Sequence, residues 1–238
     1  MKQSLSLTKL PEWVTFPLME SIPFYKNILQ RNPEELKYLQ TFSSLVEITP
    51  GEVMIRKGDV DCYVYSVLLG QLIAFYDHTT RHPVGYISRG EMFGEMAMVQ
   101  NLKRQATVVA DSNSKKIMLL ATDFSPFGEI EDFSEISLKT KLAFFHSAID
   151  IIRKRLVAFR VNYPDYQIAK RALKSSRFEG KKGTLEELLH LYEATRLLSK
   201  QLNEWNAEVG NLFSAQPYVL PDTLETLTML FDKHKKSA

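Results

Sequence analysis

Two charged side chains, Glu95 and Arg104, lie in a stretch whose residue types are suited to binding a phosphorylated sugar. The planar, permanently charged guanidinium of Arg104 can bind two phosphate oxygens. The carboxylate of Glu95 can accept hydrogen bonds from hydroxyl groups. Residues 96–99 between them predict one short helical turn, whose first N–H groups favour an anion. Gly94 has no Cβ, so the backbone can turn tightly there and come close to a ligand.

The stretch from Phe93 to Val108, which reads FGEMAMVQNLKRQATV, contains two half-motifs at a fixed separation. The first half is filled by Phe93, Gly94, Glu95, Met96 and Ala97, and the second by Arg104, Ala106 and Thr107. The stretch, called the cassette below, resembles the phosphate-binding cassette of cyclic nucleotide-binding domains. Such domains occur in kinase regulatory subunits, gated channels and bacterial catabolite activators. The alternative is a glycine turn with a surface salt bridge between Glu95 and Arg104.

The resemblance implies a set of ligand-binding residues: Phe93, Gly94, Glu95, Met96, Ala97, Arg104, Gln105 and Ala106. In that arrangement Arg104 and the N–H groups of Met96 and Ala97 hold the cyclic phosphate, and Glu95 accepts the ribose 2′-OH. Pockets of the family that prefer cyclic GMP often carry Thr or Ser directly after the arginine. Gln105 stands there in this chain. We therefore expect cyclic AMP as the ligand in preference to cyclic GMP.

Apolar residues alternate with polar ones on both sides of Gly70, in residues 63–69 and 72–76. Such period-two runs, punctuated by glycines at short intervals, indicate an all-β roll of short strands. The resemblance implies that Gly51, Gly58 and Gly70 occupy corners of this roll, and residues 107–110 and 116–120 read as its closing strands. The expected fold class is α+β, with an antiparallel, jelly-roll-like β-roll, flanking helices and a C-terminal region of long helices.

Two helix starts precede the roll, at Ser21–Tyr25 and at Asn32–Glu35, where a capping residue stands one or two positions before a proline. After the second start, Leu36, Leu39, Phe42 and Leu45 form a helical apolar stripe. We expect three parts of the chain. They are an N-terminal arm (1–19), a cyclic nucleotide-binding domain with an N-terminal helical subdomain (20–133) and a helical dimerisation or output region (134–238).

The C-terminal region carries two heptad-like apolar stripes. The first is Leu142, Phe145, Ile149, Ile152, Leu156, Phe159 and Tyr163, and the second is Leu188, Leu191, Thr195, Leu198, Leu202, Trp205, Val209 and Leu212. Thr184 and Glu187 form a capping box that begins the second helix. The first stripe either pairs with its counterpart in a second copy of the chain or packs against the second helix of the same chain. We expect a homodimer.

Charge is uneven along the chain, with 17 Lys and Arg against 12 Asp and Glu from Ser134 onward. Within that half, residues 153–182 hold ten basic residues and two acidic ones. Such a cluster permits a DNA-binding interpretation. However, nothing after Ile168 has the short-helix, turn and polar-helix pattern of a helix-turn-helix. We therefore expect signalling to a protein partner. A transcription factor with an atypical basic region and a scaffold roll without ligand binding are the alternatives.

Other patterns exclude several classes of protein. Cys62 is the only cysteine, so a disulfide framework or thiolate metal site is not expected, and no grouping of residues suggests an enzyme. His78 and His82 have a zinc-like spacing but fall in a polar hairpin tip, so no metal is expected. No apolar run is long enough for a membrane span, and the first residues lack a signal-peptide pattern. A cytoplasmic, membrane-independent protein is the expectation.

Overall fold

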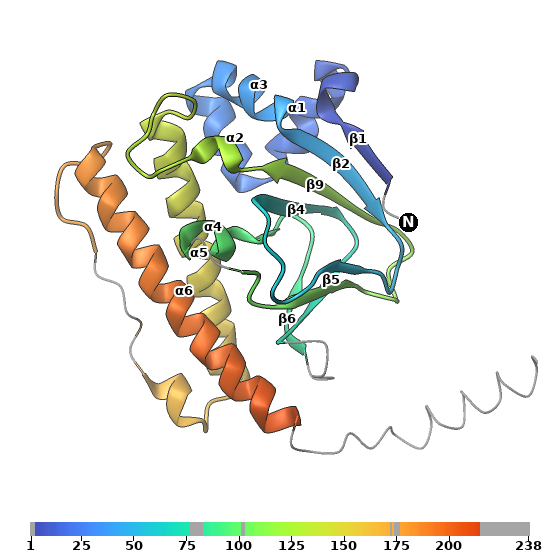
Figure 1. Cartoon of the computed structure of the whole chain (residues 1–238), viewed down its shortest axis with the longest axis vertical. Helices are drawn as coiled ribbons and strands as arrows, with labels where there is room; N and C mark the ends of the chain where they lie inside the picture. The colour runs from blue at the N-terminus through green and yellow to red at the C-terminus, as the bar shows by residue number, and fades with distance from the viewer. Residues whose placement is uncertain (1–2, 77–82, 101–102, 172, 174–176, 215–238) are drawn as a thin grey trace, which may run out of the picture.

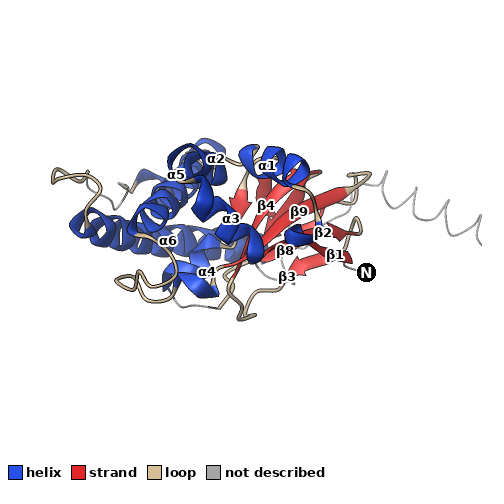
Figure 2. Cartoon of the chain, turned by 90° about the horizontal axis from the view of Figure 1, so that it is seen from above, coloured by secondary structure: helices blue, strands red, loops and turns tan. Residues whose placement is uncertain are grey.

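The computed structural model describes residues 3–76, 83–100, 103–171, 173 and 177–214 of the chain. Two antiparallel sheets form a roll on one side, and the helices gather on the other (Figures 1 and 2). One sheet has the order β1 (Gln3–Ser6), β2 (Ser43–Ile48), β9 (Ile117–Asp123), β4 (Tyr63–Leu69) and β7 (Met92–Phe93). The other has the order β3 (Val53–Ile55), β8 (Thr107–Ala110), β5 (Leu72–Phe75) and β6 (Pro83–Ile87). The expected α+β class with a β-roll is therefore confirmed. His78 and His82 lie outside the described residues.

Strand β4 is buried on both faces and contributes to both parts of the hydrophobic core. Tyr65 and Val67 point into the roll, where they pack with apolar side chains from both sheets. Val64 and Leu68, on the opposite face, belong to the core formed with the helices. Successive side chains of a strand point to opposite faces, so one strand can serve both cores. The roll is consequently a rigid base onto which the helices pack.

The strands meet at tight corners that require glycine. Gly70 connects β4 to β5 with a φ of +82°, in the region that side chains rarely adopt. A Cβ at this position would come within 2.6 Å of the carbonyl oxygen of Lys116. Gly51 and Gly58 also have positive φ, at +82° and +96°. These three glycines lie at turns, as expected.

Three helices precede most of the roll: α1 (Glu12–Glu20), α2 (Pro23–Arg31) and α3 (Pro33–Thr41). Both helices begin where the sequence indicated, with proline in the first turn of α2 and of α3. The predicted capping is wrong, because the N-cap of α2 is Ile22 and the side chain of Asn32 makes no capping hydrogen bond to α3. The predicted helical stripe extends too far, because Leu45 lies in β2 opposite Leu120. Pairing with β9 in the sheet therefore overrides the helical spacing at that position. The expected arm (1–19) contains, from Gln3 onward, β1, a short 3-10 helix (η1, Leu7–Lys9) and most of α1.

The C-terminal part consists of two long helices, α5 (Leu138–Asn162) and α6 (Leu185–Ser214), which pack side by side (Figure 1). They run in the same direction, because Phe145 meets Tyr192 at 5.6 Å between ring centroids and Phe159 meets Trp205 at 5.0 Å. The chain returns between them through residues 163–184, which include the 3-10 helix η3 (Gln167–Lys170). Thr184 Oγ1 accepts from the N–H of Glu187 at 3.2 Å, as the capping box predicts.

The described residues of the two apolar stripes pack within the chain. Ile149, Ile152, Leu156 and Phe159 of α5 share one core with Leu188, Leu191, Leu198, Leu202, Trp205 and Val209 of α6. Of the two arrangements open from the sequence, the structure has the first stripe packed against the chain's own second helix. A homodimer remains a prediction, and it would have to use another surface.

Polar contacts fix the segment that joins the roll to α5, which contains the 3-10 helix η2 (Ser125–Phe127). The carboxylate of Glu35 on α3 accepts from the N–H of Ser137 at 2.8 Å and from its hydroxyl at 2.7 Å. The ammonium group of Lys141, whose side chain is buried, donates to the carbonyl oxygens of Glu129 and Asp132, both at 2.5 Å. Burial lowers the pKa of Lys141. This lysine therefore fastens the connecting loop to the first turns of α5.

Replacing Lys141 with Met should destabilise the fold by about 2 kcal/mol, because hydrogen bonds from a charged group are lost while the aliphatic stem is retained. Thermal unfolding should show a decrease in Tm of roughly 4–8 °C for a chain of this size. Lys139→Met is the control, since Lys139 is exposed on the same helix and its replacement should change Tm little. Equal Tm values for the two variants would contradict the fastening role.

Candidate ligand-binding site

A cavity of about 960 Å³ lies between the roll and the two C-terminal helices. All eight residues that the sequence singled out line it: Phe93, Gly94, Glu95, Met96, Ala97, Arg104, Gln105 and Ala106. Its other walls come from the start of α2, from other strands of the roll including β6, and from α5 and α6. Its volume falls in the range of small-molecule sites. The cassette residues are thus brought together around a space that can hold a ligand.

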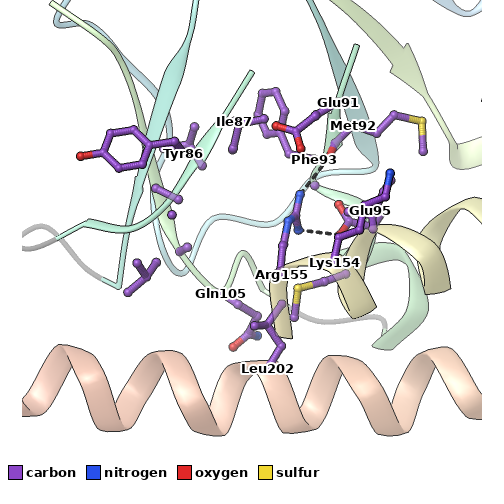
Figure 3. A pocket seen from close by; sticks show the side chains of 18 of the residues that line it. Tyr86, Ile87, Glu91, Met92, Phe93, Glu95, Gln105, Lys154, Arg155 and Leu202 are labelled. Atoms are coloured by element: carbon purple, nitrogen blue, oxygen red, sulfur yellow. Dashed lines mark hydrogen bonds and ion pairs between the residues drawn. The ribbon is translucent and has the colours of Figure 1, made fainter. Parts of the chain in front are cut away.

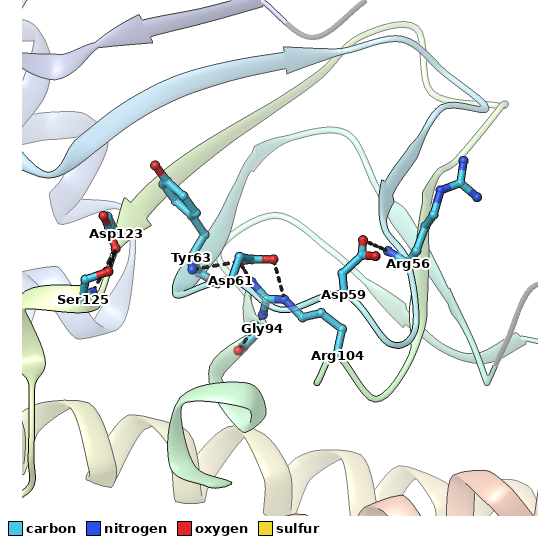
Figure 4. Close-up of polar contacts among 8 residues, drawn as sticks. All are labelled: Arg56, Asp59, Asp61, Tyr63, Gly94, Arg104, Asp123 and Ser125. Atoms are coloured by element: carbon cyan, nitrogen blue, oxygen red, sulfur yellow. Dashed lines mark hydrogen bonds and ion pairs between the residues drawn. The ribbon is translucent and has the colours of Figure 1, made fainter. Parts of the chain in front are cut away.

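Arg104 is almost fully buried, and the roll fixes its guanidinium (Figure 4). Its Nε–H donates to Asp61 Oδ2 at 3.1 Å, and Nη2 forms an ion pair with Asp61 Oδ1. Nη1 donates to the carbonyl oxygen of Gly94 at 2.9 Å, and Nη2 donates to that of Tyr63 at 2.5 Å. Four of the five N–H donors of the guanidinium are therefore used within the described part of the chain. One N–H, on Nη1, is left to bind a ligand. The sequence had suggested instead that the guanidinium would bind two phosphate oxygens.

Aromatic side chains support the arginine from the roll interior. The Tyr65 ring lies 5.8 Å from Arg104 Cζ and stacks on Phe93 with 5.2 Å between ring centroids. Burial, with a further contribution from the negative charge of Asp61, raises the pKa of Tyr65 to about 12. The phenol is consequently neutral at physiological pH. Arg104 is held by one carboxylate, two carbonyl groups and an aromatic face, so it points in a defined direction.

Glu95 begins α4 (Glu95–Gln100), and none of its surface is exposed. Arg155 of α5 extends into the cavity, where its Nη1 donates to Glu95 Oε1 and its Nη2 to the carbonyl oxygen of Met92, both at 2.8 Å (Figure 3). The other carboxylate oxygen of Glu95, Oε2, is buried and has no hydrogen-bond partner among the described residues. A buried acceptor without a donor costs about 1–3 kcal/mol. A ligand hydroxyl is one group that could satisfy it.

The remaining cassette residues complete the wall. Helix α4 covers the single turn that the sequence predicted, and the N–H of Ala97 donates to the carbonyl oxygen of Gly94 at 3.3 Å. That N–H is thus partly engaged within the turn. The side-chain amide of Gln105 donates to the carbonyl oxygen of Lys103 at 2.8 Å. Gln105 therefore lies at the edge of the cavity with its amide turned back to its own loop.

Sequence reasoning missed two residues that orient the predicted ones, Asp61 and Arg155. Asp61 comes shortly after the Gly58-Asp59 turn, and an acidic residue there could have suggested a partner for a buried arginine. The pairing with Arg104 was not evident because the two residues lie far apart in the sequence. Arg155 was counted in the basic cluster 153–182, where a solvent-exposed role was the simpler interpretation. Phe144 and Phe145 of α5 do not line the cavity and belong to the aromatic core around Phe124.

Comparison with known proteins relates part of the chain, including the cassette, to one family. The family model described as Cyclic nucleotide-binding domain matches residues 45–129. A cAMP-dependent protein kinase regulatory subunit of Blastocladiella emersonii is 38% identical over 92 residues, which are 37% of this chain and 23% of that protein. The corresponding subunit of Mucor circinelloides f. lusitanicus is 32% identical over 90 residues, 37% of this chain and 20% of that protein. The similar stretch thus spans less than a quarter of either relative. Residues 45–129 are thus similar to a cyclic nucleotide-binding domain.

Among solved structures, a putative cyclic nucleotide-binding protein from Geobacter metallireducens GS-15 aligns with a TM-score of 0.48 and 16% identity. The alignment covers 62% of this chain and 98% of that one. Helix α6 lies beyond the residues that the family model matches. None of the described helices is both long and apolar enough to cross a membrane.

The close packing of Gly94 against Arg104 can be tested by substitution. Its φ is +90°, and a Cβ there would lie 2.6 Å from Arg104 Nη1 and 3.0 Å from the carbonyl oxygen of Tyr63. Gly94→Ala should therefore cost more than the about 1–2 kcal/mol of the backbone conformation alone, because Arg104 must also move. Chemical denaturation measures this cost.

Gly58→Ala is the matched control for this prediction. Its φ is +96°, and a Cβ at Gly58 would meet no atom within 4 Å. The control carries the backbone cost without the clash. If the two alanine variants lost the same free energy of unfolding, the close contact between Gly94 and Arg104 would not constrain the site.

Proposed function

We propose that this chain is a regulatory protein that binds cyclic AMP in the cavity and signals through α5 and α6 to a protein partner. The observation that carries the proposal is the fully buried carboxylate of Glu95, with one oxygen lacking a partner, beside the fixed cation of Arg104. A cyclic nucleotide supplies both complements: a hydroxyl on the ribose and a negative charge on the cyclic phosphate. The proposed contacts are thus the 2′-OH with Glu95 and the phosphate with Arg104 and the first turn of α4.

The signalling part of the proposal rests on Arg155. This side chain, on α5, forms hydrogen bonds with the carboxylate of Glu95 in α4 and with the backbone of Met92 in β7. Both α4 and β7 are therefore linked to α5. A ligand that bonds to Glu95 changes the environment of the same carboxylate that holds Arg155. Binding acts as a switch only if it favours one arrangement of the helices over another. The Arg155 contact provides the differential interaction that such a switch needs.

The partner to test first follows from the curated relatives. These relatives are regulatory subunits of cAMP-dependent protein kinases. By similarity, we propose the catalytic subunit of a protein kinase as the partner. The basic segment 153–182 would then contribute to association with an acidic protein surface, since complementary charge speeds encounter. DNA is the less favoured partner, because DNA-binding proteins of this kind use a short recognition helix, whereas α6 is one continuous helix of 30 residues.

Arg104→Leu should weaken cyclic AMP binding by about tenfold to a hundredfold, measured by calorimetric titration of the full chain. The expected loss corresponds to one charge-assisted hydrogen bond of about 1.5–3 kcal/mol. Arg56→Leu is the control, since Arg56 is an exposed arginine of the roll that does not line the cavity. Thermal unfolding of each variant separates loss of folding from loss of binding. Undiminished binding by a folded Arg104→Leu protein would remove Arg104 from the site.

A further inference from the structure

One face of helix α5 is largely exposed, and it combines apolar with basic side chains. Val157 and Val161 are 51% and 73% exposed, although the neighbouring Leu156 and Phe159 are buried in the core shared with α6. The two valines are four residues apart, so they lie next to each other on the helix surface. A shallow depression on this side of the helix is lined by Asp150, Arg153, Lys154, Val157 and Ala158. The residues of the depression together with Val161 are called the α5 face below.

The α5 face has a basic rim and adjoins the cavity. Arg153 and Lys154 outnumber Asp150, so the charge of the face favours an acidic partner segment. Asp150, Lys154 and Ala158 also line the cavity, which places the face at the cavity's edge. A symmetric contact between two copies through this face would bring Arg153 and Lys154 of both copies close together, and like charges oppose that arrangement. The face therefore fits an acidic segment with apolar side chains better than it fits a second copy of itself.

Residues 215–238, which lie outside the described residues, contain a sequence of this chemistry. Between positions 222 and 232 the sequence has three acidic residues and no basic ones. Three apolar residues there have the spacing of one helical face: Leu224, Leu227 and Phe231. Asp222 and Glu225, three residues apart and next to this apolar run, are typical of a helix start. The sequence therefore predicts an acidic amphipathic helix at 222–232, which we call the C-terminal segment.

The end of α6 brings the C-terminal segment within reach of the α5 face. The two helices run parallel, with Trp205 beside Phe159, so Ser214 lies about 14 Å farther along the pair than the two valines. The nine residues 215–223 can span about 30 Å when extended. That length is enough to return along α5 and around its side, because a helix with its side chains is about 10–12 Å across. A tether of this kind gives an effective concentration of about 1 mM, so a contact with a Kd of only about 0.1 mM would form in roughly nine molecules of ten.

We propose that the C-terminal segment docks on the α5 face of its own chain. Its three apolar residues cover Val157 and Val161, and its acidic residues meet Arg153 and Lys154 at the rim. Docked in this way, the segment covers part of the basic residues 153–182 and borders the cavity. It is then an intramolecular cover, which an acidic surface of the protein partner has to displace. This consequence rests on the proposed function, whereas the docking itself does not.

Cross-linking of a pair of introduced cysteines tests the docking in the full chain. Cys62→Ser removes the only cysteine, and Val157→Cys with Leu227→Cys then places one thiol on each side of the proposed contact. A short bismaleimide should link the two thiols within one chain, at a rate that does not change when the protein is diluted. Peptide mapping by mass spectrometry identifies the link, and thermal unfolding shows that the variant is folded. Val161→Cys replaces Val157→Cys if the first variant does not fold.

The matched control keeps the tether and removes the complementary surface. In the same cysteine pair, Leu224→Asp with Phe231→Asp removes two of the three apolar side chains and should slow the link at least about tenfold. Equal rates with and without the two aspartates, or no link at all, would overturn the docking. Links found only between two chains would overturn it in favour of a second copy. These reactions contain no nucleotide, so each of these results leaves the proposed function intact, and failure of the wild type to bind cyclic AMP would overturn that function alone.

Discussion

The fully buried carboxylate of Glu95 constrains how the helices pack against the roll in this protein. Glu95 lies at the start of α4, and the cost of burying its charge must be offset by partners. Among the described residues, its cationic partner is Arg155 of α5, at 2.8 Å. The cassette therefore reaches its buried arrangement only when α5 is packed beside the roll. One oxygen is satisfied by the chain, and the other is left facing the cavity.

The remaining structure keeps this arrangement in place. Strand β4 is buried on both faces, so the roll and the helices share one continuous support. Lys141 and the contact of Glu35 with Ser137 fix where α5 begins. Helix α6 packs along α5 over much of its length, and Trp205 fills the seam against Phe159. Each contact restricts the direction from which Arg155 can enter the cavity.

Local sequence predicted the roll, the helix starts and the cassette because these depend on neighbouring residues. Glycine corners, proline in first helical turns and the alternation around Gly70 are short-range signals. Strand β2 could not be found in this way, since Leu45 continued a helical spacing and only pairing with β9 decides its conformation. Arg155 reaches the cavity from α5, and Asp61 holds Arg104 from the loop before β4; no local pattern brings these residues together with the cassette. The parallel packing of α5 and α6 could not be predicted either, because an apolar stripe does not show which helix it packs against.

The central claim is that the free oxygen of Glu95 accepts the ribose 2′-OH of a cyclic nucleotide. The most direct measurement compares the affinities of the wild-type chain for cyclic AMP and for 2′-deoxy cyclic AMP. The protein is identical in both titrations, so folding cannot affect the comparison. Because sites built around a hydroxyl reject analogues that lack it, the deoxy compound should bind at least about tenfold more weakly. Equal affinity for the two nucleotides would contradict the account.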